Sequence, residues 1–241
     1  MRALFVIIST LWTVFAQAEE LTFTSGPQQT SLLELYASEG CNSCPPAEEW
    51  LSRLENDPRL WREFVPVAYA VDYWDDLGWR DPYSNKRWSA RQRGYNAAGS
   101  VSSVYTPAFV INGEEWRGWF SRRVLPTSTV KVGVLKVALD DGDIEARFSP
   151  APKYAGPWVL HAAILGFGIT SDISRGENAG KTLTHDFLVL DQADSQPSNG
   201  QWRIKLPALT QPLGKKFGLA VWVTKMGDIM PVQATGGLMA E

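Results

Sequence analysis

Cys41 and Cys44 are the only cysteines in this chain of 241 residues, and two residues separate them. The preceding segment, residues 31–36, is a short apolar run typical of a buried strand. The following segment, residues 45–55, repeats apolar residues at helical spacing and starts with two prolines, which the first turn of a helix tolerates. The sequence therefore predicts a dithiol at the N-terminus of a helix.

This position predicts different roles for the two sulfurs. The free N–H groups and positive dipole of a helix N-terminus favour a thiolate over a thiol. We therefore expect Cys41 to be the attacking residue and Cys44 the resolving one. Asn42 and Ser43 supply no positive charge and Glu39 is an anion nearby, so only weak stabilisation of the thiolate is expected.

Two other uses of the cysteine pair remain open. A disulfide that closes a ring of four residues stabilises a fold by only about 2 kcal/mol, so a structural bond has little effect in a chain of this size. A closed zinc site needs four ligands, and the only histidines, His161 and His185, lie far along the chain. A redox role is favoured, with an inert disulfide or a metal site as the alternatives.

The N-terminus, residues 1–18, has the pattern of a secretory signal peptide: Met1 and Arg2, an apolar core over residues 3–15, and the small residues Ala16 and Ala18 at a cleavage site. A membrane anchor is the alternative, but a span needs about 20 apolar residues. No later stretch predicts a membrane span, and the formal net charge of −3 makes nucleic acid an unlikely partner class. The mature protein is expected to be exported.

Three further elements are predicted in the first half. Residues 64–73 are a nearly continuous apolar run, as in a central strand covered on both faces. Residues 85–98 have helical spacing, and residues 104–119 contain an X-Pro pair and an Asn-Gly turn, which predict a strand and a hairpin. Three arginines of the helix are expected on a solvated face: Arg87, Arg91 and Arg93.

Aromatic residues gather between positions 69 and 95, with seven in 27 residues. Packing of a long connection onto the sheet explains most of these rings. Tyr73 and Trp74 are the two expected to contact a bound partner. Three acids in this connection do not complete a calcium-binding pattern and are expected to be solvated: Asp72, Asp75 and Asp76.

The order strand, dithiol, helix, strand, helix, X-Pro, strand, hairpin resembles the thioredoxin fold. A closer resemblance is to a family of secreted bacterial thioredoxin-like proteins, domain-of-unknown-function family 1223. It rests on five motifs, residues 33–46, 71–79, 90–93, 104–107 and 176–185. The resemblance implies an α/β thioredoxin-like domain, a mixed sheet flanked by helices, over residues 19–128, and a periplasmic or secreted location.

The resemblance also implies roles for particular residues. Thr106 and Pro107 match the cis-proline position that faces the dithiol and positions a partner chain. Glu34 matches a buried acid that carries protons, and an apolar strand raises the pKa of such a group; the alternative is a wet strand edge. Ala70 stands where family members usually have histidine. The helix expected over residues 121–131 is weak and predicted to be short or absent.

Residues 129–241 change to short alternating runs, which predict a mainly β, sandwich-like C-terminal unit. These runs are residues 130–139, 144–148, 158–167, 182–190, 202–206 and 219–224. Residues 176–180 are either turn formers or a ligand loop, and His185 is expected to be a hydrogen-bonded structural residue rather than a catalytic one. Met226 and Met230 are expected in the core, with a copper site as the alternative.

Together these patterns predict an exported protein that exchanges disulfides with protein thiols or disulfides through Cys41 and Cys44. No cofactor is expected, and the oligomeric state is left open. A binding module with an inert disulfide is one alternative. Copper delivery through the two thiolates is another, although it lacks the histidine that such sites commonly use.

Overall fold

The computed structural model describes residues 20–121, 123–209 and 216–239. The predicted signal peptide, residues 1–18, lies outside the described residues. Within these ranges, no helix has the length and apolar character needed to cross a membrane.

The strands are β1 (Leu21–Thr24), β2 (Ser31–Ala37), β3 (Phe64–Ala70), β4 (Ala108–Ile111), β5 (Glu114–Trp116), β6 (Gly133–Asp140), β7 (Asp143–Pro150), β8 (Trp158–Phe167), β9 (Ile169–Asp172), β10 (Thr182–His185), β11 (Leu188–Asp194), β12 (Gln201–Lys205), β13 (Lys216–Lys225) and β14 (Pro231–Leu238). The α-helices are α1 (Pro45–Ser52) and α2 (Lys86–Ala97).

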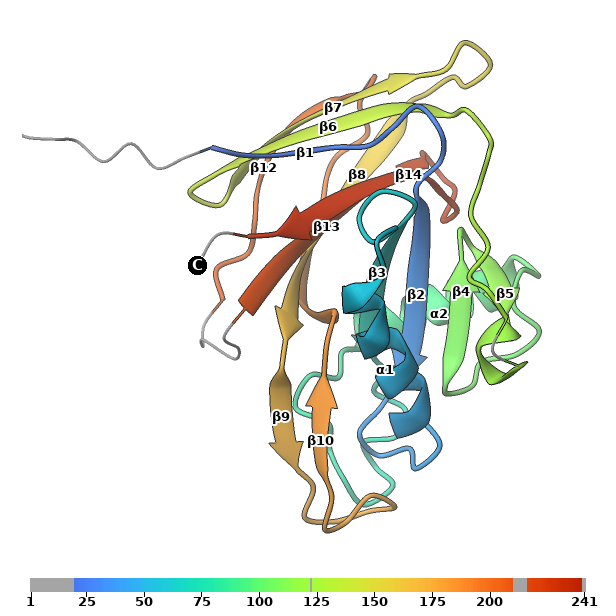
Figure 1. Ribbon diagram of the computed structural model, residues 1–241, viewed down its shortest axis with the longest axis vertical. Coiled ribbons are helices and arrows are strands. Elements are labelled where there is room, and N and C mark those ends of the chain that lie inside the picture. The colour runs from blue at the N-terminus through green and yellow to red at the C-terminus, as the bar shows by residue number, and fades with distance from the viewer. Residues whose placement is uncertain (1–19, 122, 210–215, 240–241) are drawn as a thin grey trace, which may run out of the picture.

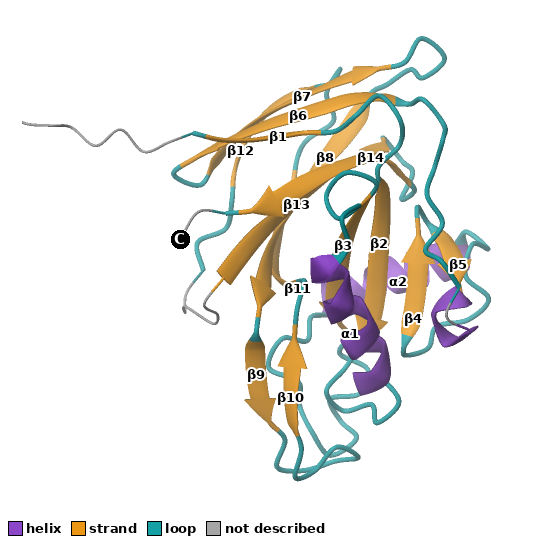
Figure 2. Cartoon of the chain, in the orientation of Figure 1, coloured by secondary structure: helices purple, strands orange, loops and turns teal. Residues whose placement is uncertain are grey.

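An eight-stranded main sheet in the order β14-β13-β8-β11-β3-β2-β4-β5 dominates the fold (Figure 1). Strand β3 is parallel to both β2 and β11, and the other neighbours are antiparallel. Every residue of β2 and β3 is buried, as expected for central strands. Figure 2 shows why: α1 covers one face of this part of the sheet and α2 covers the other.

The predicted fold class, an α/β thioredoxin-like domain followed by a sandwich-like β unit, is wrong. The described chain is mainly β, with α-helices of only eight and twelve residues. The main sheet does not end at β3, because the Ala68 N–H donates to the Phe187 carbonyl and β11 then continues the sheet toward β8 and β13. The predicted boundary at residue 128 concerns independent folding and stays a prediction.

A second sheet, in the order β1-β6-β7-β12, forms another layer. Its strands alternate between buried and exposed positions, which is the pattern of a sheet with one face on the core. The buried face packs on β8 and β13 of the main sheet. The largest residues of this core are Phe23, Leu135, Val137, Leu139, Ile144, Phe148, Trp158, Leu160, Trp202, Leu219, Val221 and Val223.

Local signals determine the elements that surround the dithiol. Helix α2 begins after Asn85, whose side chain accepts a hydrogen bond from the Arg87 N–H at 2.9 Å and so caps the helix. The β4–β5 hairpin turns at Asn112 and Gly113, which have φ of 50° and 92°, as a type I′ turn requires. Residues 123–131 contain no helix.

Candidate functional site

The dithiol lies where β2 ends and α1 begins. Cys44 is the N-cap of α1, and Pro45 and Pro46 occupy its first turn. The Cys44 carbonyl accepts hydrogen bonds from the backbone N–H groups of Ala47 and Glu48, at 2.9 and 3.1 Å. The two cysteines are not joined by a disulfide. The structure therefore has the strand–dithiol–helix order that the sequence predicts.

The two sulfurs differ in their surroundings. Cys41 receives hydrogen bonds from the Cys44 thiol, from Ser43, whose Oγ lies 3.2 Å from Cys41 Sγ, and from Thr106. Led by the Cys44 thiol, these donors lower the pKa of Cys41 to about 6, although burial opposes the shift. Burial raises the pKa of Cys44 well above its ordinary value. Stabilisation of the Cys41 thiolate exceeds the sequence expectation because hydroxyl and thiol donors replace the missing positive charge.

This asymmetry gives a first prediction. In the reduced protein, the thiolate absorbance at 240 nm should increase with pH in a step centred near pH 6, because Cys41 ionises there. Cys41→Ser should remove that step and leave the high-pH titration of Cys44. A single step near pH 9, the ordinary value for a thiol, would contradict the hydrogen-bonded arrangement.

The predicted partner-binding residues lie beside the dithiol. The Thr106–Pro107 peptide bond is cis, and the Thr106 hydroxyl contacts Cys41 and accepts a hydrogen bond from Trp74 Nε1 at 2.8 Å. The Tyr73 hydroxyl donates to Gln92 Oε1 at 3.1 Å. The connection from β3 to α2 therefore reaches across the dithiol to the segment before β4.

Trp74 lies beside the turn that contains Cys41. Cys41 is 0% exposed, although a disulfide must reach its sulfur for exchange to occur. A Cβ built on Gly40 would lie 3.2 Å from Trp74 Cβ, and the indole N–H bonds Thr106 on the other side. Because Gly40 and Thr106 both neighbour Cys41, the Trp74 side chain spans the residues that flank the sulfur.

Removal of this ring should expose Cys41. We expect Trp74→Ala to accelerate alkylation of Cys41 by iodoacetamide about tenfold at constant pH, equivalent to removing about 1.4 kcal/mol of opening free energy. The matched control is Leu77→Ala, because Leu77 lies in the same connection and is 62% exposed. An unchanged alkylation rate in folded Trp74→Ala protein would show that the ring does not limit access.

A buried cluster of charged groups joins the two segments on either side of the dithiol. His185 Nε2 lies 3.1 Å from Glu39 Oε1, and its Nδ1 lies 3.3 Å from Glu48 Oε1. The second Glu39 oxygen accepts from Trp79 Nε1 at 2.7 Å. Burial would lower the pKa of His185, but Glu48 and Glu39 raise it to about 10. His185 is thus a protonated bridge between the end of β2 and α1.

Sequence reasoning missed two members of this cluster. Glu48 lies one helical turn beyond Cys44, and this spacing could have indicated that its side chain lies near the dithiol. Asp81 is 3% exposed and accepts hydrogen bonds from the backbone N–H groups of Glu39 and Tyr83, both at 2.9 Å. Burial, followed by the charge of Glu39, raises the pKa of Asp81 to about 7. No local pattern distinguished this residue from the solvated acids before it.

The loop between β9 and β10 also lies at the dithiol. Figure 1 shows the β9–β10 ribbon running past the end of β2 at which the dithiol lies. The side chain of Asn178 contacts the backbone of Glu39 and Cys41, and Glu177 Oε2 accepts a hydrogen bond from the Asn42 N–H at 3.0 Å. The sequence left this loop as either turn formers or a ligand loop, and the structure places it on the turn that contains Cys41.

Glu34 lies away from the dithiol. It is fully buried and accepts hydrogen bonds from the guanidinium of Arg91 at 2.8 and 3.0 Å, and from the hydroxyls of Tyr36 and Tyr95, both at 2.6 Å. Since Arg91 and Tyr95 belong to α2, Glu34 points to the face of the sheet opposite α1. The structure therefore gives this carboxylate an ion-pair partner and does not bring it to Cys41 or Cys44. The alternative, that Glu34 lies at a solvated strand edge, is also wrong, because the side chain is fully buried.

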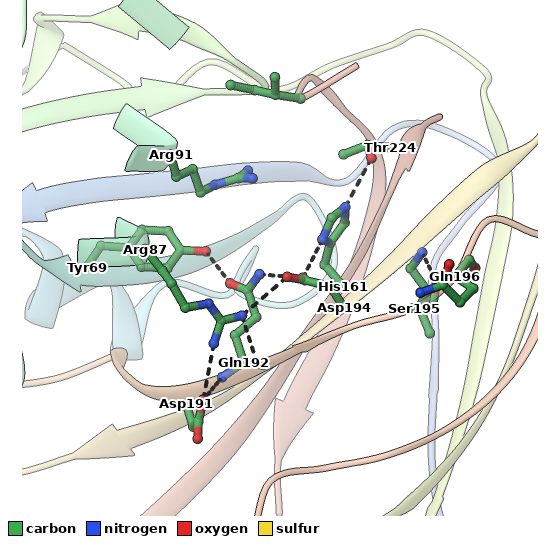
Figure 3. Close-up of polar contacts among 12 residues, drawn as sticks. Tyr69, Arg87, Arg91, His161, Asp191, Gln192, Asp194, Ser195, Gln196 and Thr224 are labelled. Atoms are coloured by element: carbon green, nitrogen blue, oxygen red, sulfur yellow. Dashed lines mark hydrogen bonds and ion pairs between the residues drawn. The ribbon is translucent and has the colours of Figure 1, made fainter. Parts of the chain in front are cut away.

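The expectation of a solvated Arg91 is wrong, since its side chain is only 12% exposed. The same face of the sheet holds a second polar network (Figure 3), in which His161 lies 2.7 Å from Asp194 and 3.0 Å from Thr224. Burial lowers the pKa of His161. Arg87 lies at the exposed rim of this network and donates a hydrogen bond to Asp194 at 3.2 Å. These contacts occupy both ring nitrogens of His161.

The remaining candidates lie outside the dithiol site. Asp72 accepts a hydrogen bond from the Ser89 hydroxyl, and Asp75 from the Ser84 hydroxyl at 2.7 Å. Met226 is 53% exposed and therefore outside the core where it was expected. Over the described ranges, no group of three or more His, Cys, Asp or Glu side chains is arranged to hold a metal ion.

Fold and site together define a mainly β protein with a C-x-x-C dithiol at the start of a helix. The chain belongs to the family described as protein of unknown function (DUF1223), whose model matches residues 32–224. No curated protein matches it.

Two solved structures are similar to it. Protein AGR_C_4864 from Agrobacterium tumefaciens has 22% identity and a TM-score of 0.57, with 88% of this chain and 94% of that chain covered. HBP35 of Porphyromonas gingivalis has 16% identity and a TM-score of 0.50, with 87% of this chain and 75% of that chain covered. At these identities the similarity concerns the fold alone.

Proposed function

We propose that this protein exchanges disulfides with a partner protein through Cys41 and Cys44. The observation that carries the proposal is the asymmetry of the pair. Cys41 Sγ accepts hydrogen bonds from Cys44, Ser43 and Thr106, which favour its thiolate, while Cys44 is buried and protonated. A nucleophilic thiolate beside a protonated resolving thiol is the arrangement that exchange requires.

The reaction proceeds in two balanced steps. The Cys41 thiolate attacks one sulfur of the partner's disulfide; the partner's S–S bond breaks, a mixed disulfide forms, and the other partner sulfur leaves as a thiolate. Cys44 then gives its proton to the released partner thiolate and attacks Cys41 Sγ, so that the Cys41–Cys44 disulfide forms and the second partner sulfur leaves as a thiolate. The partner gains the two electrons that the dithiol loses. The same steps in reverse oxidise a partner dithiol.

The local arrangement of the site also supports the proposal, because it resembles that of the thioredoxin superfamily. In both, the dithiol lies between a strand and a helix and a cis-proline faces it. We assign Thr106 and Pro107 to positioning the partner chain, and Tyr73 and Trp74 to contact with it after Trp74 moves away from Cys41. The signal-peptide pattern of residues 1–18 supports export to the periplasm or beyond, where disulfides persist.

A trapping experiment tests the reaction. Reduced Cys44→Ser protein is mixed with an unfolded protein that contains one disulfide, and the products are separated without reductant. The variant should accumulate a mixed disulfide through Cys41, because the residue that resolves it is gone. The matched control, Cys41→Ser, should form none, since Cys44 is buried and protonated. Absence of an adduct with Cys44→Ser would contradict exchange.

A second candidate is a binding module that keeps the dithiol without turnover. One observation favours it, namely the complete burial of Cys41. The trap distinguishes the two candidates when it is repeated with Trp74→Ala in the same background. An adduct that forms with both proteins supports exchange, and no adduct with either supports the binding module. Copper delivery has no observation in the described residues that favours it.

A further inference from the structure

Asn178 lies 137 residues beyond Cys41 in the chain, yet its side chain packs on the dithiol turn. Its Nδ2 atom donates to the Glu39 carbonyl at 2.8 Å and to the Cys41 carbonyl at 3.0 Å. Its Oδ1 atom accepts from Lys181 Nζ at 2.7 Å. Because an ammonium group only donates and a carbonyl only accepts, these three contacts agree on a single orientation of the amide.

These contacts hold the backbone on both sides of Gly40. Asn178 is fully buried, so the two carbonyls that it contacts are shielded from water and need protein donors. The Cys41 carbonyl also accepts from the Cys44 N–H at 3.2 Å. A Cβ added to Gly40 would lie 3.2 Å from Trp74 Cβ, so Trp74 leaves little room beside Gly40. The Cys41 backbone, from which the sulfur projects, is therefore held both by local turn hydrogen bonds and by the distant side chain of Asn178.

We propose that Asn178 is a positioning residue for the dithiol: by holding the carbonyls of Glu39 and Cys41, it keeps Cys41 Sγ at its hydrogen-bond donors and so maintains the thiolate. The inference rests on the proposed exchange reaction and adds a residue that controls the nucleophile. Asn178 acts through the backbone, because its amide contacts carbonyl oxygens and neither sulfur. Its loss should allow the turn to move, and the donors on Ser43 and Thr106 should then separate from Cys41.

Charged groups from several elements also face this turn and are unchanged by substitution of Asn178. Lys181 and Glu177 belong to the same loop, and His185 follows it in β10. Glu39 lies two residues after β2, Glu48 lies on α1, and Asp81 lies in the connection from β3 to α2. The groups to be kept constant in the comparison are Glu39, Glu48, Asp81, Glu177, Lys181 and His185.

The experiment compares Asn178→Ala with Asn96→Ala. Asn96 is a suitable control because its Nδ2 also donates to a backbone carbonyl, that of Val101 at 2.9 Å, but away from the dithiol. Thermal stability and the titration of Cys41, followed by thiolate absorbance at 240 nm, are measured for both. We expect Asn178→Ala to raise the midpoint of the Cys41 titration by at least about one pH unit, a tenfold change in ionisation, and Asn96→Ala to leave it unchanged.

An unchanged Cys41 midpoint in folded Asn178→Ala protein, even with lower thermal stability, would overturn the inference, since a purely structural residue behaves in that way. If Asn178→Ala does not fold, Asn178→Ser keeps one donor, and a smaller upward shift is expected; no shift overturns the inference. Trapping with Cys44→Ser protein that keeps Asn178 separates the two proposals. Mixed disulfides without an Asn178 effect remove only this inference, and an Asn178 effect without mixed disulfides removes only the exchange reaction.

Discussion

Arg91→Ala is expected to lower the free energy of unfolding by about 3–5 kcal/mol, because it leaves the fully buried carboxylate of Glu34 without its cation. The hydroxyls of Tyr36 and Tyr95 remain as donors to that carboxylate, but they carry no compensating charge. Denaturation by urea, followed by circular dichroism, measures the difference. This ion pair lies on the α2 face of the main sheet.

The matched control is Arg87→Ala, one turn earlier on α2. The Arg87 side chain is 42% exposed, and its partners Asp191 and Asp194 are also exposed, so a loss of only about 0–1 kcal/mol is expected. Arg91→Ala should also leave the Cys41 titration unchanged, because the ion pair and the dithiol lie on different faces of the sheet. A loss below about 1 kcal/mol would contradict the buried ion pair, and a shifted Cys41 midpoint would contradict its separation from the dithiol.

The second large effect is the dependence of stability on pH through His185. Its pKa is raised from 6.5 to about 10 in the folded protein, so between these values the folded histidine is protonated and the unfolded one is not. Its stabilising contribution is fully present below about pH 6.5. The free energy of unfolding should then fall by about 1.4 kcal/mol per pH unit toward pH 10.

Cys41 titrates in the same range with the opposite effect, since its pKa is lowered to about 6 in the folded protein. The measurement is therefore made in Cys41→Ser protein, with urea denaturation at several pH values between 6 and 9. Adding His185→Asn should abolish most of the fall in stability with pH and lower stability mainly near pH 6. Equal pH dependence with and without His185 would mean that Glu39 and Glu48 do not hold the histidine protonated.

The elements at the dithiol were predictable because their signals are local. The continuous apolar runs of β2 and β3, the prolines after Cys44 and the Asn85 cap each determine the conformation of a few neighbouring residues. The sheet order was not predictable in this way. A run of alternating residues predicts a strand but does not specify its neighbour, so the pairing of β11 with β3 and of β1 with β6 could not be deduced.

The partners of the polar residues were not predictable, for a related reason, although a hydrogen-bonded role was expected for His185. Arg91 lies between Trp88 and Tyr95 on one face of α2. Its charge predicted a solvent-exposed side chain, but in the structure it pairs with the buried Glu34. Asn178 and His185 come from a segment more than 130 residues beyond Cys41. A buried polar residue is identifiable from sequence only when its partner is known, and here each partner lies on a different strand or loop.

The reduction potential of the Cys41–Cys44 pair tests the central claim most directly. The protein is equilibrated in glutathione buffers of known potential, the free thiols are alkylated, and the reduced fraction is determined by mass. An exchange dithiol with a stabilised Cys41 thiolate predicts a potential above about −300 mV, in the range of catalytic pairs. A potential below about −300 mV would identify an inert structural disulfide and contradict the exchange reaction.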